Sequence, residues 1–338
     1  MIERKVTIQD IATDVGVSKT TISRYLNGNF SNMSRATRDR IDASITRLNY
    51  TPNNAARTLK AKKSHVIAVI ANTLRYQMGA QTVSSILELC NQDGYTTALY
   101  CSDDLPEKED AAIRSCISQQ VEGAIIIPCR NDPVPYEQLM NAGIPVVLSS
   151  RRLVNWQGTN IYVNHEDLIG SMMKHLFTQG FEKVRLLMDF ESFHKIWMRQ
   201  IFEKNAQGYF NMQPEECASI VGRDPERVDA AVLHFLSEYD GKKKALFAMN
   251  TNTLQFTLEA LKKHNIVVPD EIGVCGYDAL GWSKLVPPGI SAIRQPMMRT
   301  GRMAAEKLLG ILEGGRDRHE KIALDGEIFY RNSTCLRR

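Results

Sequence analysis

The residues best suited to contact nucleic acid lie near the start of the chain. The spacing of apolar residues predicts a helix from Lys19 to Leu26, with Lys19, Thr20 and Arg24 on its outer face. Arginine pairs bidentately with guanine, threonine contacts the thymine methyl group, and hydroxyl groups bind phosphate oxygens. This pattern therefore favours a helix that reads bases in the major groove of DNA.

Neighbouring segments must hold that helix in place. Thr7 and Asp10 form a capping-box-like start for an earlier helix, and Gly16 supplies the positive φ of a sharp turn. Ser18 is suited to cap the second helix, and a third follows Ser34. The spacing predicts a small all-α helix-turn-helix head, while a simple pair of packed helices remains the alternative.

The charge distribution agrees with a DNA partner for this region. The chain has 338 residues, with 42 Lys and Arg against 38 Asp and Glu, giving a net charge of +4. Residues 1–63 hold twelve basic and five acidic residues, which leaves about +7 there and about −3 on the rest. We therefore expect operator binding to weaken steeply with salt, through the head alone.

The composition excludes several classes of protein. Apolar residues make up 43% and charged residues 24%, as in ordinary globular domains, and aliphatic runs such as Ala124–Ile127 are far too short to span a membrane. The first five residues do not resemble a secretory signal. Seven irregularly spaced cysteines with no C-x-x-C indicate free thiols. We expect a cytoplasmic protein with no metal, no cofactor and no membrane partner.

Beyond residue 64, short apolar runs alternate with amphipathic stretches. Nine runs are predicted as strands: 66–71, 96–100, 124–127, 145–148, 161–163, 184–188, 218–221, 245–248 and 273–277. Eight stretches are predicted as helices: 79–92, 107–120, 135–142, 167–179, 194–209, 225–239, 253–264 and 298–313. This alternation predicts an α/β core of two doubly wound lobes, with ligands at the carboxyl ends of the strands.

The head resembles the DNA-binding region of the lactose/galactose repressor (LacI/GalR) family. The similarity runs through Val6-Thr7-Ile8-x-x-Ile11-Ala12-x-x-x-Gly16-Val17-Ser18-x-x-Thr21-Ile22-Ser23-Arg24-Tyr25-Leu26-Asn27-Gly28 and Leu48-Asn49-Tyr50-x-Pro52-Asn53-x-x-Ala56-Arg57-x-Leu59. The resemblance implies that Lys19, Thr20 and Arg24 read bases. It implies that phosphate-facing positions are Thr7, Ser18, Thr21, Ser23 and Asn27.

The resemblance also implies a hinge helix and linker over residues 51–64, after a head of residues 1–50. Further DNA contacts would come from Asn53, Asn54, Ala56, Arg57, Leu59 and Lys60. A helix of two turns is marginal alone in water, so we expect it to order on DNA. Leu59 matches the family's minor-groove wedge, with a packed linker residue as the alternative.

Over residues 65–338 the looser resemblance implies a periplasmic-binding-protein-like core for effector binding and dimerisation. We expect lobe one over about 65–163 and 291–323, and lobe two over about 164–290 and 324–338. The candidate effector contacts are Leu74, Tyr76, Met78, Ser150, Arg151, Trp197, Arg199, Arg223, Asn250 and Asp278. Asn250 and Asp278 follow strands, where turn formation is the alternative role. Either Met198 or Arg199 takes the position of the family's effector-binding arginine.

Six arginines lie near predicted strand ends or cleft loops: Arg75, Arg130, Arg151, Arg152, Arg199 and Arg223. Because arginine favours carboxylate and phosphate groups, we hypothesise a sugar acid or sugar phosphate, with surface ion pairs as the alternative role for most of them.

The sequence as a whole predicts a homodimeric repressor of a carbohydrate utilisation operon, bound to a pseudo-palindromic operator and controlled by a small sugar-type effector. The alternatives are a periplasmic-type solute-binding protein and an α/β enzyme acting on sugars. The chain carries no G-x-G-x-x-G after the first predicted strand, no P-loop and no G-x-S-x-G, so we do not expect an enzyme. The sequence leaves open the identity of the effector, its sign as inducer or corepressor, and dimer against tetramer.

Overall fold

The chain forms two compact units, Met1–Ser64 and His65–Arg338. The computed structural model describes residues 6–26, 28–31, 33–50, 64–239, 241–277 and 281–336. Eight of the candidate site residues lie outside these described residues: Asn27, Asn53, Asn54, Ala56, Arg57, Leu59, Lys60 and Asp278. The two units are described separately.

The first unit contains three described helices, α1 (Ile8–Val15), α2 (Lys19–Leu26) and α3 (Arg35–Arg47). One fully buried isoleucine from each helix, Ile11, Ile22 and Ile41, forms its centre. The expected helix-turn-helix head is confirmed.

Local hydrogen bonds fix the two ends that orient α2. The backbone N–H and the hydroxyl of Thr7 both donate to the Asp10 carboxylate, at 2.8 and 2.7 Å. Gly16 adopts φ +72°, a left-handed conformation that side chains disfavour, and so ends α1 sharply. The hydroxyl oxygen of Ser18 accepts a hydrogen bond from the Thr21 N–H at 3.1 Å and caps α2.

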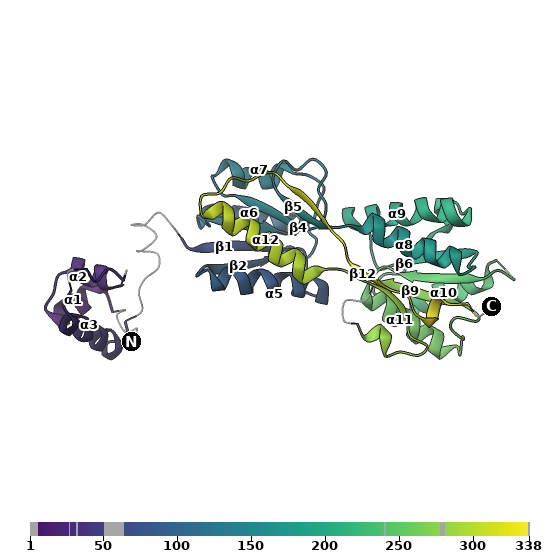
Figure 1. Ribbon diagram of the computed structural model, residues 1–338, viewed down its shortest axis with the longest axis horizontal. Coiled ribbons are helices and arrows are strands. Elements are labelled where there is room, and N and C mark those ends of the chain that lie inside the picture. The colour runs from purple at the N-terminus through teal and green to yellow at the C-terminus, as the bar shows by residue number, and fades with distance from the viewer. Residues whose placement is uncertain are drawn as a thin grey trace. The chain divides into compact units, whose positions relative to one another are not determined.

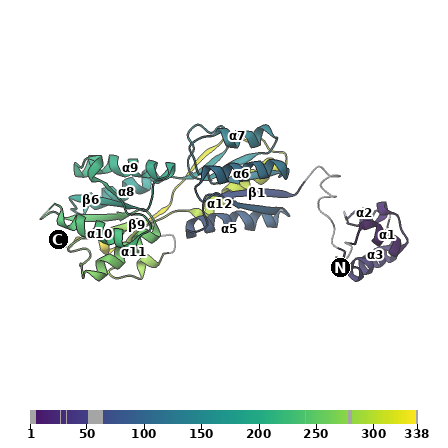
Figure 2. The same cartoon turned by 180° about the vertical axis from the view of Figure 1, so that it is seen from behind.

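The second unit contains two six-stranded sheets of matching topology (Figures 1 and 2). The first sheet has the order β11-β5-β4-β3-β1-β2 and the second β12-β10-β9-β8-β6-β7. All strand pairs are parallel except β10 with β12. The first sheet comprises β1 (Val66–Ala71), β2 (Thr96–Cys101), β3 (Gly123–Ile126), β4 (Val146–Ser150), β5 (Asn160–Val163) and β11 (Lys321–Leu324). The second comprises β6 (Lys183–Met188), β7 (Ala218–Ile220), β8 (Lys244–Ala248), β9 (Gly273–Tyr277), β10 (Ser291–Arg294) and β12 (Glu327–Phe329).

Helices cover both faces of each sheet, which explains why the central strands are continuous apolar runs. The first sheet lies between α6 (Pro106–Ser118) with α7 (Val134–Asn141) on one face and α5 (Gln77–Gln92) with α12 (Met297–Leu312) on the other. The second lies between α8 (His165–Thr178) with α9 (Phe193–Phe210) and α10 (Pro225–Ser237) with α11 (Thr251–Lys263). The predicted pair of doubly wound lobes is confirmed.

The chain passes between the lobes three times, after β5, after β10 and after β11. The strand at Ser291–Arg294 pairs with β9, so it belongs to the second lobe, and its expected place in the first lobe was wrong. The return to the first lobe comes only at α12, which packs against the first sheet. Leu324, expected in the second lobe, ends β11 and pairs with Val163 in the first sheet.

None of the described helices is both long enough and apolar enough to cross a membrane.

Candidate functional site

The exposed face of α2 carries the expected base-reading residues. Lys19, Thr20 and Arg24 are all exposed. Within the described part of the head, the side chains of these three residues take part in no hydrogen bond and no ion pair. Their donors are therefore available to a nucleic acid, while Ile22 on the opposite face anchors the helix.

The expected phosphate-facing hydroxyls are divided between capping and surface roles. Thr7 donates to Asp10, and the Ser18 and Thr21 hydroxyls lie 2.9 Å apart, so these three also stabilise helix starts. Ser23 is half-buried. Capping places the hydroxyls of Thr7 and Ser18 at helix N-termini, where backbone N–H groups also favour phosphate.

Three arginines of α3 hold the head together. Arg47 pairs with Asp14 on α1, and Arg40 donates to the Val15 carbonyl oxygen. Arg38 donates to the Met33 carbonyl oxygen at 3.1 Å. The Ser44 hydroxyl at 2.5 Å and the Arg47 guanidinium hold the pKa of the Asp14 carboxyl below its usual value. Basic residues on α3 are thus partly structural, unlike those exposed on α2.

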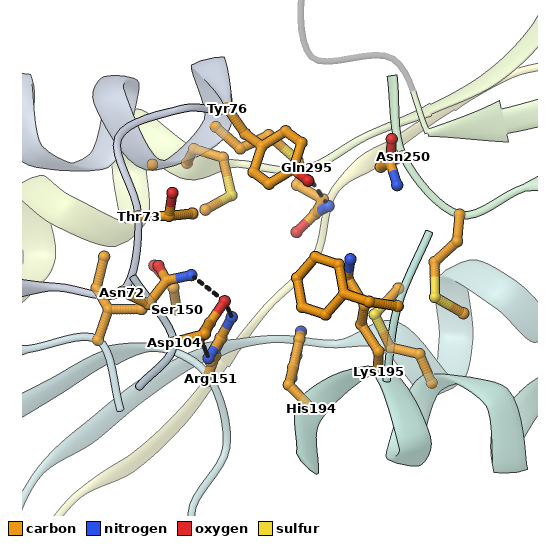
Figure 3. Close-up of a pocket in the computed structure, with 17 residues that line it drawn as sticks. Asn72, Thr73, Tyr76, Asp104, Ser150, Arg151, His194, Lys195, Asn250 and Gln295 are labelled. Atoms are coloured by element: carbon orange, nitrogen blue, oxygen red, sulfur yellow. Dashed lines mark hydrogen bonds and ion pairs between the residues drawn. The ribbon is translucent and has the colours of Figure 1, made fainter. Parts of the chain in front are cut away.

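In the second unit, a pocket lies where the carboxyl ends of the two sheets face each other (Figure 3). It contains about 730 Å³ of atom-free space, including its open mouth. Its lining comes from the carboxyl ends of β1, β2, β3, β4, β6, β8 and β10, or the segments after them, and from the start of α9. This is the edge of doubly wound sheets at which ligands bind.

The segment after β1 brings Tyr76 and Met78 into the pocket, as expected. A Cβ on Gly79 would lie 2.2 Å from the Thr73 carbonyl oxygen, so only glycine permits this close approach. Leu74 does not line the pocket and is 40% exposed, because the segment turns it outward. The expected contact from Leu74 was therefore wrong.

At the end of β4, Ser150 and Arg151 both line the pocket. Ser150 adopts φ +67°, an unusual conformation for a residue with a side chain, and it marks a constrained position. Arg151 forms an ion pair with Asp104 at 2.6 Å, and both side chains are buried. Asn72 also donates to Asp104, at 3.2 Å. The Arg151 charge is thus already balanced within the protein.

The first turns of α9 bring His194, Lys195 and Met198 to the pocket. Of the two alternatives for the family's arginine position, Met198 faces the pocket and Arg199 does not. Arg199 pairs instead with Glu191 and with Glu203, because one step along a helix turns a side chain by about 100°. Arg199 as an effector contact was therefore wrong.

Trp197, which the sequence suits equally to a ring platform or to the core, does not line the pocket. It packs against the lobe-two core beside the rings of His165 and His194, at centroid distances of 5.7 and 5.8 Å.

Burial lowers the pKa of His165 to about 3, and the His165 ring binds the Tyr277 hydroxyl. Burial, together with nearby positive charges, also lowers the pKa of His194 well below its usual value. Both rings are neutral near pH 7, and His194 offers an uncharged edge to the pocket.

Asn250 caps a helix and also lines the pocket. Its Oδ1 caps α11 by accepting the Thr253 N–H at 2.9 Å. Its Nδ2 is buried at the pocket and has no hydrogen-bond partner among the residues that the structure describes, and the side chain is only 4% exposed. Because a buried amide N–H without a partner is costly, this group points to a ligand that supplies an acceptor.

The six arginines expected to attract an acidic ligand are mostly occupied by carboxylates. Ion pairs join Arg75 to Asp103, Arg130 to Glu109 and Asp110, Arg151 to Asp104, Arg152 to Glu166, and Arg199 to Glu191 and Glu203. Arg223, an expected effector contact, does not line the pocket either; it lies over the rings of Tyr76 and Phe190, 5.1 and 5.0 Å from their centroids. The arginine count alone therefore does not establish an acidic ligand.

Several lining residues were not anticipated: Asn72, Thr73, Gly79, Asp104, Ile127, Phe190, His194, Lys195, Met249, Gln295 and Met297. Asn72 and Met249 directly follow β1 and β8, so the strand-end rule could have identified them. Four methionines, Met78, Met198, Met249 and Met297, give the pocket an adaptable apolar wall opposite its polar groups.

Comparisons with known proteins agree with both units. A family model described as bacterial regulatory proteins, lacI family, matches residues 7–53, and one described as a periplasmic binding protein-like domain matches residues 173–334. The HTH-type transcriptional regulator KdgR of Bacillus subtilis is 27% identical over 334 residues, with 97% of each chain covered. The regulator PtxS of Pseudomonas aeruginosa is 27% identical over 330 residues, covering 98% of this chain and 96% of that one.

Solved structures show the same fold. The lac repressor dimer bound to operator and the anti-inducer ONPF superposes with a TM-score of 0.84 at 23% identity, covering 98% of this chain and 100% of that one. A periplasmic binding protein/LacI transcriptional regulator from Alkaliphilus metalliredigens, complexed with D-xylulofuranose, gives a TM-score of 0.63 at 19% identity, covering 80% and 98%.

A helix-turn-helix head and a two-lobed core with a polar pocket define a DNA-binding protein with a candidate ligand site. The chain carries a head domain of the lacI family of bacterial regulatory proteins and a periplasmic binding protein-like domain, and it is a DNA-binding transcriptional regulator.

Proposed function

We propose that this chain represses a carbohydrate utilisation operon and that a small sugar-type effector in the core pocket sets its affinity for the operator. The observation that carries the proposal is the buried Nδ2 of Asn250, which lines the pocket without a partner among the described residues. The free outer face of α2 provides the matching DNA-reading surface in the same chain.

The effector we propose is a small polyol bearing an acidic group, a sugar acid or sugar phosphate. Asn250, Asn72 and Thr73 suit hydroxyl groups, and the four methionines suit the apolar face of a short carbon chain. Positive charge comes from the ammonium of Lys195 inside the pocket and from Arg223 over the rings of Tyr76 and Phe190. These two cations replace the wider set of arginines as the basis for an acidic ligand.

On DNA we propose a homodimer bound to a pseudo-palindromic operator. The similar lac repressor structure is described as a dimer bound to operator, and a two-fold protein suits a two-fold DNA site. Residues 51–64 would act as the hinge that couples core to head, with Leu59 as the wedge. A groove beside α11, lined by Leu258, Val268 and Trp282, offers apolar surface for pairing between cores.

Control of operator binding requires only that the effector bind one arrangement of the two lobes more tightly than the other. An effector that binds one lobe arrangement about a hundredfold more tightly changes operator affinity by roughly 2.7 kcal/mol. The regulator acts in the cytoplasm, where its operator lies, and performs no chemistry on the effector.

The test begins with an operator selected in vitro from random duplexes by the full-length protein. Fluorescence anisotropy then measures its affinity with and without D-gluconate, 6-phosphogluconate and D-glucose at one salt concentration. We expect an acidic ligand to shift operator affinity at least tenfold, with the direction assigning it as inducer or corepressor. Selection of no preferred sequence, or a shift with neutral glucose alone, would overturn the corresponding part of the proposal.

A further inference from the structure

One side-chain hydrogen bond joins the two lobes beside the pocket. The Tyr76 hydroxyl, from the first lobe, donates to Oδ2 of Asp189 in the second lobe at 2.8 Å. Asp189 directly follows β6 and is only 4% exposed. The contact therefore ties the segment after β1 to the corresponding segment of the other sheet.

The second oxygen of Asp189 is also occupied. Its Oδ1 accepts from the ammonium of Lys195, near the start of α9. Both groups are buried, and burial lowers the pKa of Lys195 below its usual value although the adjacent carboxylate opposes this. A buried ion pair is costly to break on one side, because the remaining charge is left without compensation.

Aromatic contacts strengthen the same junction. The Lys195 ammonium lies 3.6 Å from the ring centroid of Phe190, and Arg223 lies over both Phe190 and Tyr76. Two cations of the second lobe are thus arranged around one phenol of the first lobe. Such contacts are stronger where the cation is shielded from water.

Tyr76 and Lys195 both line the pocket, yet the Tyr76 hydroxyl and the Lys195 ammonium both bind Asp189, which is not part of the lining. An ammonium and a phenolic hydroxyl are also a suitable donor set for the carboxylate of a ligand. The protein's own carboxylate therefore occupies the donors that an acidic effector requires.

We propose that Asp189 is an internal competitor of the effector: it clasps the two lobes through Tyr76 and pairs with Lys195 inside the second lobe, and the anionic group of the effector replaces it on Lys195. Replacement weakens the Tyr76–Asp189 contact and so connects anion binding to lobe position. Asp189 thereby sets both the charge selectivity of the pocket and its coupling to the head. This inference rests on the proposed acidic effector.

The test compares Asp189→Asn with wild type in the full-length protein. Asparagine keeps the size and an acceptor for the Tyr76 hydroxyl but removes the competing charge. We expect Asp189→Asn to bind D-gluconate at least tenfold more tightly by calorimetry, with D-glucose binding changed by less than threefold. Unchanged or weaker gluconate binding by the variant would overturn the competitor role. Glu191→Gln is the matched control, since it removes a nearby carboxylate that pairs with Arg199 outside the pocket.

A second measurement tests, without any ligand, whether the Tyr76–Asp189 hydrogen bond clasps the two lobes. Tyr76→Phe removes only the hydroxyl that crosses between the lobes. Hydrogen exchange should become at least threefold faster in segments 72–79 and 189–196 of the ligand-free variant, with no change around α10. Unchanged exchange would show that the contact does not hold the lobes, whatever the effector is. If wild type and Asp189→Asn bind only glucose, the proposed acidic effector and the competitor role both fail, and the exchange result alone decides the clasp.

Discussion

Basic side chains serve different purposes in the head and in the pocket. The side chains of Lys19 and Arg24 on α2 are exposed and have no hydrogen-bond or ion-pair partner among the described residues. At the pocket, Arg151 is buried and Lys195 is largely buried, and each is paired with an aspartate. The same residue types are thus open to an external polyanion in one unit and paired with internal carboxylates in the other. The comparison shows that the ligand of a site is indicated by whether its charged side chains already have partners, and not by how many charged residues there are.

The largest expected effect comes from the free cation on α2. Arg24→Ala should weaken operator binding by about 1–3 kcal/mol at one base position and relax the preference there, because a bidentate base contact is lost. Selection on randomised duplexes measures the preference. Arg47→Ala is the matched control: Arg47 pairs with Asp14, so its loss should reduce head stability and leave base preference intact. An unchanged preference in Arg24→Ala would remove it from the base-reading face.

Leu59 lies outside the described residues, and its proposed contact with DNA is apolar instead of charged. Leu59→Ala should weaken operator binding by roughly tenfold or more, because a wedge that unstacks a base step contributes up to a few kcal/mol. Binding to random duplex should change by less than twofold. Titrations of both duplexes at one salt concentration measure the two losses. Equal losses on operator and random DNA would contradict the wedge role.

A substitution in the pocket should change the affinity for the effector and leave the affinity for DNA unchanged. Asn250→Ser keeps a capping oxygen for α11 but removes the free Nδ2 donor, so effector affinity should fall by about 1 kcal/mol, roughly fivefold. Calorimetry on the full-length protein measures this change. Arg199→Ala, which the sequence favoured as a contact and the structure places outside the pocket, should leave effector affinity unaltered. Unchanged effector affinity in Asn250→Ser together with weakened affinity in Arg199→Ala would favour Arg199 as the effector contact.

The smallest expected effect concerns the internal pairs of the head. The pKa of Asp14 is lowered by Ser44 and Arg47, so its ionised form stabilises the folded head at neutral pH. That contribution is present above the unfolded pKa of about 3.9 and is lost as the pH falls through the folded value. Hydrogen exchange in α1 and α3 should accelerate on acidification in wild type and respond less in Asp14→Asn. Equal pH responses would show that the pair adds no stability.

Much of the fold follows from sequence because the central strands are buried on both faces. Val66–Ala71 and Gly273–Tyr277 are continuous apolar runs, and both form strands over those residues. The short strands β10, β11 and β12 escape such reasoning, since no long apolar run marks them, and β11 pairs with β5, which is distant in sequence. This explains the misplaced lobe boundary at residue 291.

The site was predictable only where strand ends define it. Ser150 ends β4, Arg151 follows it, and Asn250 lies just beyond β8; all three line the pocket. Which residues of α9 face the pocket depends on the rotational phase of the helix. An error of one residue in the sequence comparison therefore selected Arg199 in place of Met198. Lys195 was missed because its role depends on Asp189, whose proximity only the folded chain shows.

The central claim is that the head reads DNA while the core pocket senses a ligand and transmits its presence. The most direct measurement is operator affinity by fluorescence anisotropy, with and without a saturating effector, for wild type and for Asn250→Ser. Wild type should shift at least tenfold on effector addition. The variant should bind the operator as wild type does without effector, and at the effector concentration that just saturates wild type it should show a smaller shift. A variant that loses operator binding, or one that responds as fully as wild type, would contradict this division of roles.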